Sequence, residues 1–183
     1  MIRLFDFIFA FLGIIILSPL LVVLFIIGYF DTGSPLFRQQ RLGKNKVSFP
    51  LIKFRSMHLN TLSVPTHLAN ASSLTKYGTF LRKSKLDELP QLFNVLLGHM
   101  SLVGPRPNLL NQEDLIKIRE SLGVYKIRPG ITGLAQINQI DMSTPQLLAE
   151  TDAQMASNFS TFLYFKFIIQ TIFGKGSGDR IIK

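Results

Sequence analysis

The chain has 183 residues, 47% of them hydrophobic, and a formal net charge of +9 from 20 basic and 11 acidic residues. This length leaves room for one modest domain and a membrane element, and argues against a second globular domain. The absence of cysteine excludes disulfides and thiolate metal sites, and His58, His67 and His99 lack the close spacing of zinc motifs. The basic balance favours anionic partners such as nucleic acid, phospholipid headgroups or phosphorylated substrates.

Residues 7–30 form an uncharged, strongly apolar segment. As a helix it would be about 36 Å long, enough to enter or cross a hydrocarbon core of about 30 Å. The segment exceeds the hydrophobic region of a signal peptide, and no small-x-small cleavage site precedes Asp31. We therefore expect it to be retained as a membrane element.

Ser18-Pro19 lies at the midpoint of this segment and predicts a sharp bend. Proline lacks the N–H that would bond the Ile15 carbonyl and its ring clashes with that turn, while Ser18 can bond a freed carbonyl. Each arm, about 16 Å long, is too short to cross the core. A hairpin that enters one leaflet and returns is one interpretation, supported by basic residues on both flanks. A kinked transmembrane helix is the other, because membrane helices tolerate proline.

The chain from Thr32 to Leu86 contains no acidic residue. Attraction to anionic lipid explains its first cations, Arg38 to Lys46, since each juxtamembrane cation contributes about 1 kcal/mol. Nucleic acid is not an expected partner, because no basic recognition helix or RNA-binding aromatic motif is present. The ten basic residues of this stretch are Arg38, Arg41, Lys44, Lys46, Lys53, Arg55, Lys76, Arg82, Lys83 and Lys85.

The acidic pair Asp87-Glu88 ends this stretch, at the start of a predicted helix that closes at Gly98. With Asp87 as the N-cap, Pro90 falls at a position where its missing N–H is not needed. The spacing thus favours Asp87 as a cap and Glu88 as a helix-dipole partner. A catalytic role is the alternative: the preceding cations attract phosphate and keep Asp87 ionised as a nucleophile, and adjacent acids can hold a divalent metal.

Proline-rich and polar motifs follow the acidic pair. Pro105 and Pro107 stiffen the backbone around Arg106, which can present its guanidinium to a phosphate; an ordinary proline turn is the alternative. Residues 125–138 place further polar groups around a Pro-Gly turn, either in a site or in a loop. These polar groups are Arg128, Thr132, Gln136 and Asn138.

Helices are predicted for most of the remaining chain. Asn111 would cap a helix from about residue 112 to 122 that ends at Gly123, and Thr144-Pro145 would begin another. Residues 161–173 carry four phenylalanines and a narrow polar side, which fits an interfacial helix and a buried helix equally well. The expected fold class is α-rich α+β.

Four motifs stand in order behind the broken apolar segment: FRQQRLG, LIKFRSM, LDELPQLFNVLLGHMSLVGPRP and RPGITGLAQIN. In order and spacing they resemble the small monotopic phosphoglycosyl transferases, or bacterial sugar transferases, from about residue 3 to about residue 175. The resemblance implies transfer of a sugar 1-phosphate from a UDP-sugar to a polyprenol phosphate (undecaprenyl phosphate), with release of UMP, to initiate glycoconjugate biosynthesis. It also implies a monotopic protein at the cytoplasmic face of the bacterial inner membrane, with a re-entrant hairpin at 1–31. Residues 32–183 would form the catalytic domain with its membrane-surface helices.

The same resemblance assigns roles to residues. Asp87 would attack the β-phosphate and form a phosphosugar-aspartate, with Glu88 as its partner and Mg²⁺, bound at Asp87 and Glu88, neutralising the diphosphate. Polyprenol phosphate would then attack the intermediate, so the soluble donor and the lipid acceptor react in separate displacements. Arg82 matches the family's phosphate-binding arginine. The further phosphate or nucleotide candidates are Lys53, Arg55, Pro105, Arg106, Pro107, Arg128, Thr132 and Gln136.

Departures from the family pattern bear on the choice of sugar, which the sequence does not identify. Leu134 stands where many relatives have tryptophan, Gln139 stands where glycine is common, and residues 153–155 replace an aromatic-rich stretch. Two other functions compete: a membrane-bound sugar-nucleotide phosphohydrolase with water as acceptor, and a non-enzymatic basic membrane scaffold. No GxGxxG or Asp-x-Asp motif points to another nucleotide-sugar fold. A homodimer is compatible with the sequence.

Overall fold

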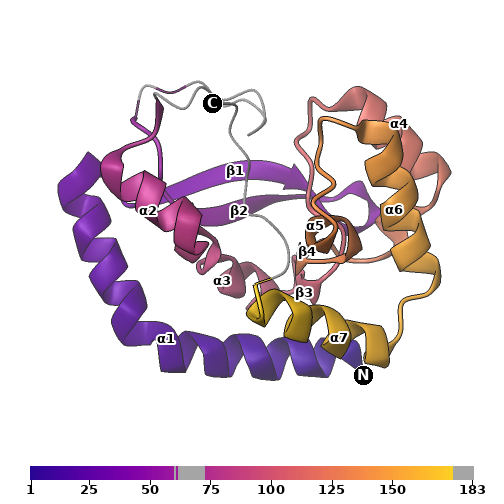
Figure 1. The fold of residues 1–183 in the computed structure, drawn as a ribbon, viewed down its shortest axis with the longest axis horizontal. Coiled ribbons are helices and arrows are strands. Elements are labelled where there is room, and N and C mark those ends of the chain that lie inside the picture. Colours follow the sequence, from indigo (N-terminus) through magenta and orange to yellow (C-terminus); the bar gives the residue numbers. More distant parts are fainter. Residues whose placement is uncertain (60, 62–72, 175–183) are drawn as a thin grey trace.

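The computed structural model describes residues 1–59, 61 and 73–174, in which helices surround two small sheets (Figure 1). The α-rich α+β class that the sequence predicts is confirmed for these residues. The domain range 32–183 extends beyond them. The helices are α1 (Ile2–Thr32), α2 (Lys76–Ser84), α3 (Gln91–Leu96), α4 (Glu113–Ser121), α5 (Leu134–Ile137), α6 (Pro145–Ser157) and α7 (Thr161–Ile172). The strands are β1 (Leu36–Leu42), β2 (Ser48–Phe54), β3 (Ser101–Val103) and β4 (Gly130–Thr132).

The N-terminal helix α1 is 31 residues long and contains Pro19. It bends, so that one arm runs along the lower edge of the molecule and the other turns up beside α2 (Figure 1). Ser18 Oγ donates a hydrogen bond of 2.8 Å to the carbonyl of Ile15, which has lost its proline-blocked partner. The predicted bend is therefore confirmed. In the part of the chain that the structure describes, α1 alone is long and apolar enough to cross a membrane.

Both arms of α1 are tied to the same domain. In the first arm, Arg3 donates a hydrogen bond of 2.8 Å to the carbonyl of Leu96 at the end of α3. In the second arm, the carbonyl of Leu24 accepts a hydrogen bond of 2.7 Å from the hydroxyl of Tyr77 on α2. Burial and the nearby Asp31 raise the pKa of Tyr77 to about 12, so this hydroxyl remains a donor at neutral pH. The bent helix thus wraps around the domain instead of leading away from it.

A buried carboxylate, Asp6, adds a third attachment of α1. Its Oδ1 accepts hydrogen bonds of 2.9 Å each from Ser101 Oγ, the Leu102 amide and the hydroxyl of Tyr164. Asp6 is 1% exposed, and a carboxylate this deep is stable only when its charge is hydrogen-bonded. One side chain therefore joins α1 to β3 and α7.

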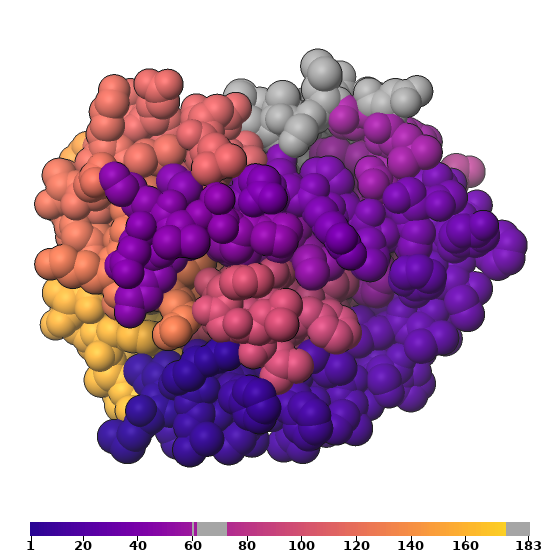
Figure 2. Space-filling view, turned by 180° about the vertical axis from the view of Figure 1, so that it is seen from behind, coloured from indigo at the N-terminus to yellow at the C-terminus, as the bar shows by residue number. Residues whose placement is uncertain are grey.

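The strands β1 and β2 form an antiparallel hairpin that pairs Leu36 with Phe54 and Leu42 with Ser48. Figure 2 shows this hairpin, in purple, across the middle of the molecule, with α1 along the lower edge. Phe49 and Leu51 are buried on one face of β2 and pack with residues of α1 and α3. The hairpin is therefore the platform on which α3 and the first arm of α1 rest.

The second sheet consists of β3 and β4, which pair in parallel. Gly104 N donates to Thr132 O at 2.8 Å, and Gly130 N donates to Pro105 O at 2.9 Å. A Cβ at Gly130 would lie 2.0 Å from Gly104 N, so only glycine fits this close approach of two backbones. The sheet thus holds the proline-rich segment after β3 against the segment that contains β4.

The predicted N-cap at Asp87 is wrong. Asp87 lies inside a 3₁₀ turn, and α3 begins only at Gln91, after Pro90. The reason is Lys85, whose left-handed conformation (φ 58°) ends α2 and stands directly before the turn Leu86–Glu88, so that Asp87 lies inside this turn and not at its start. The other end is as predicted, because Gly98, with φ 87°, follows the last turn of α3.

The predicted cap at Asn111 is also wrong. The helix α4 begins at Glu113, and the Gln112 side chain instead accepts a hydrogen bond of 2.8 Å from the Leu109 amide. The predicted helix stop is confirmed, since Gly123 (φ 70°) follows α4, and α6 begins at Pro145 as expected.

The last described helix, α7, combines the two interpretations that its sequence left open. Tyr164 and Phe167 are buried in the core, whereas Phe162 and Ile172 are 76% and 74% exposed. Phe165 lies edge-on to Phe5 with ring centroids 5.1 Å apart, so α7 packs alongside the first arm of α1 (Figure 1). The helix is buried on one side and exposes apolar side chains on the other.

Candidate active site

Asp87 lies in the tight turn Leu86–Glu88 that joins α2 to α3. The preceding helix is capped by Thr75, whose hydroxyl accepts a hydrogen bond of 2.8 Å from the Gly78 amide, and it ends in the reversal at Lys85. The turn leaves Asp87 only 4% exposed. Asp87 is therefore a buried acid at the junction of two helices, directly after a strongly basic segment.

The neighbouring acid, Glu88, brings two other predicted site residues together. Its Oε1 lies 2.9 Å from Lys53 Nζ on β2 and 3.2 Å from Arg106 NH2 in the segment after β3. The three side chains are between 11% and 22% exposed, so water screens their attraction less than it would at the surface. Residues far apart in the sequence thus form one charged centre beside Asp87.

Arg82 lies in the last turn of α2, five residues before Asp87. Its Nε donates a hydrogen bond of 2.8 Å to Ser56 Oγ, which comes from the LIKFRSM motif. Its NH1 is buried and has no hydrogen-bond partner among the described residues. A buried charged donor without a partner is costly, so this nitrogen is suited to an anionic group that enters the site.

A small hollow beside the charged centre is lined by Arg41, a cation for which the sequence predicts a role in attraction to lipid. Arg41 lines this hollow with Lys53 and Arg106, and it is only 8% exposed. Its NH1 donates a hydrogen bond of 3.2 Å to the carbonyl of Pro107. Arg41 is therefore not a lipid-facing surface cation. The detectable signal was its cross-strand position opposite the buried Phe49.

The remaining predicted residues contact other parts of the chain. Arg55 Nε donates to the Ser34 carbonyl at 2.8 Å and so braces the exit from α1. Arg128 Nε donates to the Gly98 carbonyl at 3.0 Å behind α3. Their roles in phosphate binding stay predictions, as do those of three residues close to the Arg106 segment or to α7. Thr132 is hydrogen-bonded to Thr171, Gln136 to the carbonyl of Gly104, and the carbonyl of Pro105 to the Gly130 amide.

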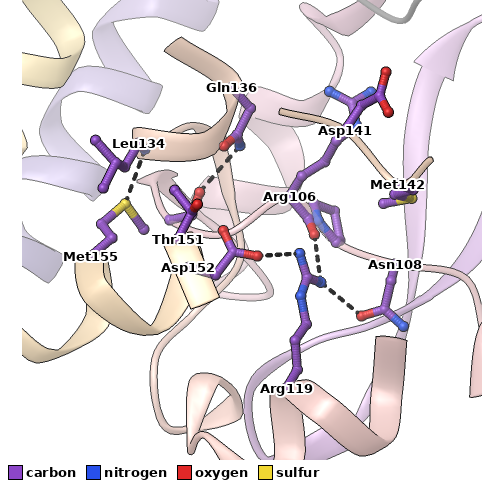
Figure 3. Close-up of polar contacts among 12 residues, drawn as sticks. Arg106, Asn108, Arg119, Leu134, Gln136, Asp141, Met142, Thr151, Asp152 and Met155 are labelled. Carbon is purple, nitrogen blue, oxygen red and sulfur yellow. Dashed lines mark hydrogen bonds and ion pairs between the residues drawn. The ribbon is translucent and has the colours of Figure 1, made fainter. Parts of the chain in front are cut away.

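A buried polar network behind the Arg106 segment was not predicted. Arg119 on α4 and Asp152 on α6 form an ion pair of 2.5 Å, with side-chain exposures of 2% and 1% (Figure 3). Burial raises the pKa of the Asp152 carboxyl, and the Arg119 guanidinium opposes that rise. Burial also raises the pKa of Tyr125, whose hydroxyl donates to Asn108 Oδ1 at 3.0 Å. Their sequence positions carry no motif that could have indicated this pairing.

The carboxylates at the site suit a magnesium ion that arrives with a substrate. Among the described residues, no three His, Asp or Glu side chains gather as a ready-made metal site. Mg²⁺ is commonly held by one or two carboxylates together with substrate phosphates and water. The adjacent Asp87 and Glu88 supply that donor chemistry.

Comparison with known proteins decides the family. The family model "Bacterial sugar transferase" matches residues 1–176, nearly the whole chain. The chain belongs to the bacterial sugar transferase family. This confirms the resemblance seen in the ordered motifs, and it places the charged centre of this sugar transferase within the matched region.

The names of two relatives of this chain state an activity. It is 39% identical, over 93% of its length and 39% of the relative's, to a UDP-glucose:undecaprenyl-phosphate glucose-1-phosphate transferase of Klebsiella pneumoniae. It is 37% identical, over 78% of its length and 34% of the relative's, to an undecaprenyl-phosphate galactose phosphotransferase of Salmonella typhimurium. A sugar transferase of Bacillus subtilis, EpsL, is 37% identical over 93% of this chain and 84% of its own. The chain thus spans about two fifths or less of the first two proteins and most of the third.

Proposed function

We propose that this sugar transferase moves a sugar 1-phosphate from a UDP-sugar to polyprenol phosphate, with undecaprenyl phosphate as the acceptor, and releases UMP. The observation that carries the proposal is the buried Asp87 beside a centre of Lys53, Glu88 and Arg106. Arg82 NH1, which has no hydrogen-bond partner among the described residues, supports it, since a diphosphate would supply an acceptor. The names of the relatives point to the same class of donor and acceptor.

The proposed reaction consists of two displacements at one phosphorus. Asp87 attacks the β-phosphorus of the UDP-sugar, an Asp87 oxygen–phosphorus bond forms, and the bond to the bridging oxygen breaks, so that UMP leaves with that oxygen. An oxygen of polyprenol phosphate then attacks the same phosphorus, and Asp87 leaves as a carboxylate. The product is a polyprenyl diphosphate sugar. Lys53, Arg82 and Arg106 offset the negative charge at the site.

Magnesium is part of the proposal through the two adjacent acids. Asp87 and Glu88 would hold the ion, and when bound it would neutralise charge on the diphosphate. The ion pairs with Lys53 and Arg106 fix the position of the Glu88 carboxylate beside Asp87.

We propose that α1 is a re-entrant hairpin in the cytoplasmic leaflet of the bacterial inner membrane, with the described catalytic residues on the cytoplasmic face. Two observations support this topology. The bend lies at Ser18 and Pro19, halfway along the helix. Residues at both ends of α1 bind the same domain, which a straight membrane-crossing helix would place on opposite sides. The exposed apolar residues of α7 would then face the same lipid surface.

Single-cysteine labelling tests the topology, because the chain has no native cysteine. We expect a cysteine inserted before Ile2 and another introduced as Asp31→Cys to react with a membrane-impermeant maleimide from the cytoplasmic side only. A Ser18→Cys variant, at the tip of the hairpin that the proposal places inside the membrane, is expected to resist the reagent from both sides. Labelling of the two end positions from opposite sides would establish a spanning helix instead.

The reaction is tested by mass spectrometry of the purified full chain with Mg²⁺ and a panel of UDP-sugars. We expect UMP formation and one phosphosugar on the peptide that contains Asp87, and loss of this adduct when undecaprenyl phosphate is added. Free sugar phosphate without acceptor would identify a phosphohydrolase. No UMP with any donor would exclude the proposed transfer and leave the scaffold function.

A further inference from the structure

The segment that carries Arg106 is held through its carbonyl groups. Two of the residues in Gly104–Asn108 are prolines, which have no N–H to donate, so the carbonyls are the main attachment points of this backbone. Each of the five consecutive carbonyls accepts a hydrogen bond, and the donors come from four elements, α4, α5, β1 and β4. The donors to Gly104, Pro105, Arg106, Pro107 and Asn108 are, in order, Gln136 Nε2, Gly130 N, Arg119 NH1, Arg41 NH1 and Leu42 N, at 3.2, 2.9, 2.9, 3.2 and 3.0 Å.

Arg119 donates to the carbonyl of Arg106, the residue of this segment that belongs to the charged centre. Its NH1 donates to the Arg106 carbonyl at 2.9 Å and to Asn108 Oδ1 at 3.0 Å, so it binds the residues on both sides of Pro107. Figure 3 shows Arg119 reaching from α4 to Asn108 on one side and to Asp152 on the other. The guanidinium therefore spans the gap between the Arg106 segment and α6.

Asp152 makes this position of Arg119 tenable. A buried guanidinium is stable only when a buried anion offsets its charge, and the 2.5 Å pair with Asp152 provides that anion. Tyr125 completes the network by donating to Asn108 Oδ1 at 3.0 Å. The network's hydrogen bonds to the Arg106 carbonyl and to the Asn108 side chain connect it to the charged centre through the Arg106 backbone.

We infer that Asp152 and Arg119 are positioning residues for the transfer, fixing the Arg106 backbone so that its guanidinium meets Glu88 beside Asp87. The inference rests on the proposed function. The 3.2 Å contact of Arg106 NH2 with Glu88 Oε1 depends on where this backbone lies. A displacement of about 1 Å in a charge-stabilising group can lower a rate by about 10²-fold.

The test uses the isosteric substitution Asp152→Asn in the full chain, with Leu148→Ala as the matched control. Leu148 is also buried on α6 and packs with Leu115 of α4, but its apolar side chain has no group that can hydrogen-bond to the network. We expect Asp152→Asn to lower kcat for UMP formation by about 10²-fold, with the KM for the UDP-sugar changed only a few-fold. Leu148→Ala should lower the Tm at least as much and retain kcat per folded molecule.

Two further measurements separate positioning from general destabilisation. In an Arg106→Lys background, Asp152→Asn should add little, because the group that it positions is already altered. Hydrogen exchange of residues 104–112 should accelerate in Asp152→Asn and not in Leu148→Ala. The inference would be overturned if the effects of the two substitutions on kcat multiplied in the double variant. It would also be overturned if Asp152→Asn left kcat or the hydrogen exchange of residues 104–112 unchanged. If no donor gives UMP with the native chain but exchange still accelerates, the positioning of Arg106 stands and the proposed reaction fails.

Discussion

Asp87→Asn should abolish formation of the phosphosugar adduct and lower the rate of UMP release by about 10⁴-fold or more, as removal of an enzyme nucleophile does. The amide has nearly the same shape as the carboxylate but no nucleophilic oxygen charge. The substitution therefore removes the proposed bond-forming atom while leaving the turn at Leu86–Glu88 intact. Adduct mass and initial rates of UMP release measure the two effects.

The control for this result is Asp114→Asn, which removes one negative charge from the exposed first turn of α4. Asp114→Asn should retain full activity, which would show that the loss of one negative charge does not by itself explain the loss of activity in Asp87→Asn. The Tm of Asp87→Asn should stay close to that of the native chain. An adduct on Glu88, or undiminished turnover by Asp87→Asn, would reassign the nucleophile.

Asp6→Ala should be the most damaging substitution for stability in α1. It leaves Ser101, Leu102 and Tyr164 without the acceptor that all three share, in a site where Asp6 is 1% exposed. Each buried donor left unsatisfied costs about 1 to 3 kcal/mol, so the expected loss is about 3 kcal/mol or more. For a chain of this size that corresponds to a fall in Tm of about 10 °C.

Thermal unfolding in detergent micelles measures this loss. Asp31→Ala, near the other end of the same helix, is the matched control because Asp31 is exposed and should change the Tm only slightly. A native-like Tm for Asp6→Ala would mean that α1 is held by its apolar contacts alone.

Features encoded in adjacent residues could be predicted from the sequence. The bend at Ser18-Pro19 and the helix stops at Gly98 and Gly123 follow from backbone chemistry that the residues carry with them. Glu88 and Arg106, which the structure brings together with Lys53, could be singled out from their local sequence, whereas Lys53 was named only through the family motifs. The cap at Asp87 failed because nothing in the local pattern indicates that Lys85 adopts a left-handed conformation.

Features that depend on distant residues could not be predicted. Asp6 and Tyr164 are separated by 158 positions, and Arg119 and Asp152 by 33. Asp6 lies in an apolar helix and Asp152 in a helix that the sequence predicts. A charged residue in a helix normally faces water, so the sequence predicts that both side chains are exposed, whereas the structure buries them. Only the packing of α1, α4, α6 and α7 turns these side chains inward.

The attachment of both arms of α1 to the domain determines how far the active site lies from the membrane surface. If α1 lies in one leaflet as proposed, Arg3 and Tyr77 anchor its two arms to the domain that carries Asp87, and the membrane insert and the reactive carboxylate move as one body. The distance from Asp87 to the plane of lipid phosphates is then built into the protein and does not vary with a hinge. An acceptor lipid would be recognised at the depth where its phosphate resides, and the length of its hydrocarbon tail would matter little.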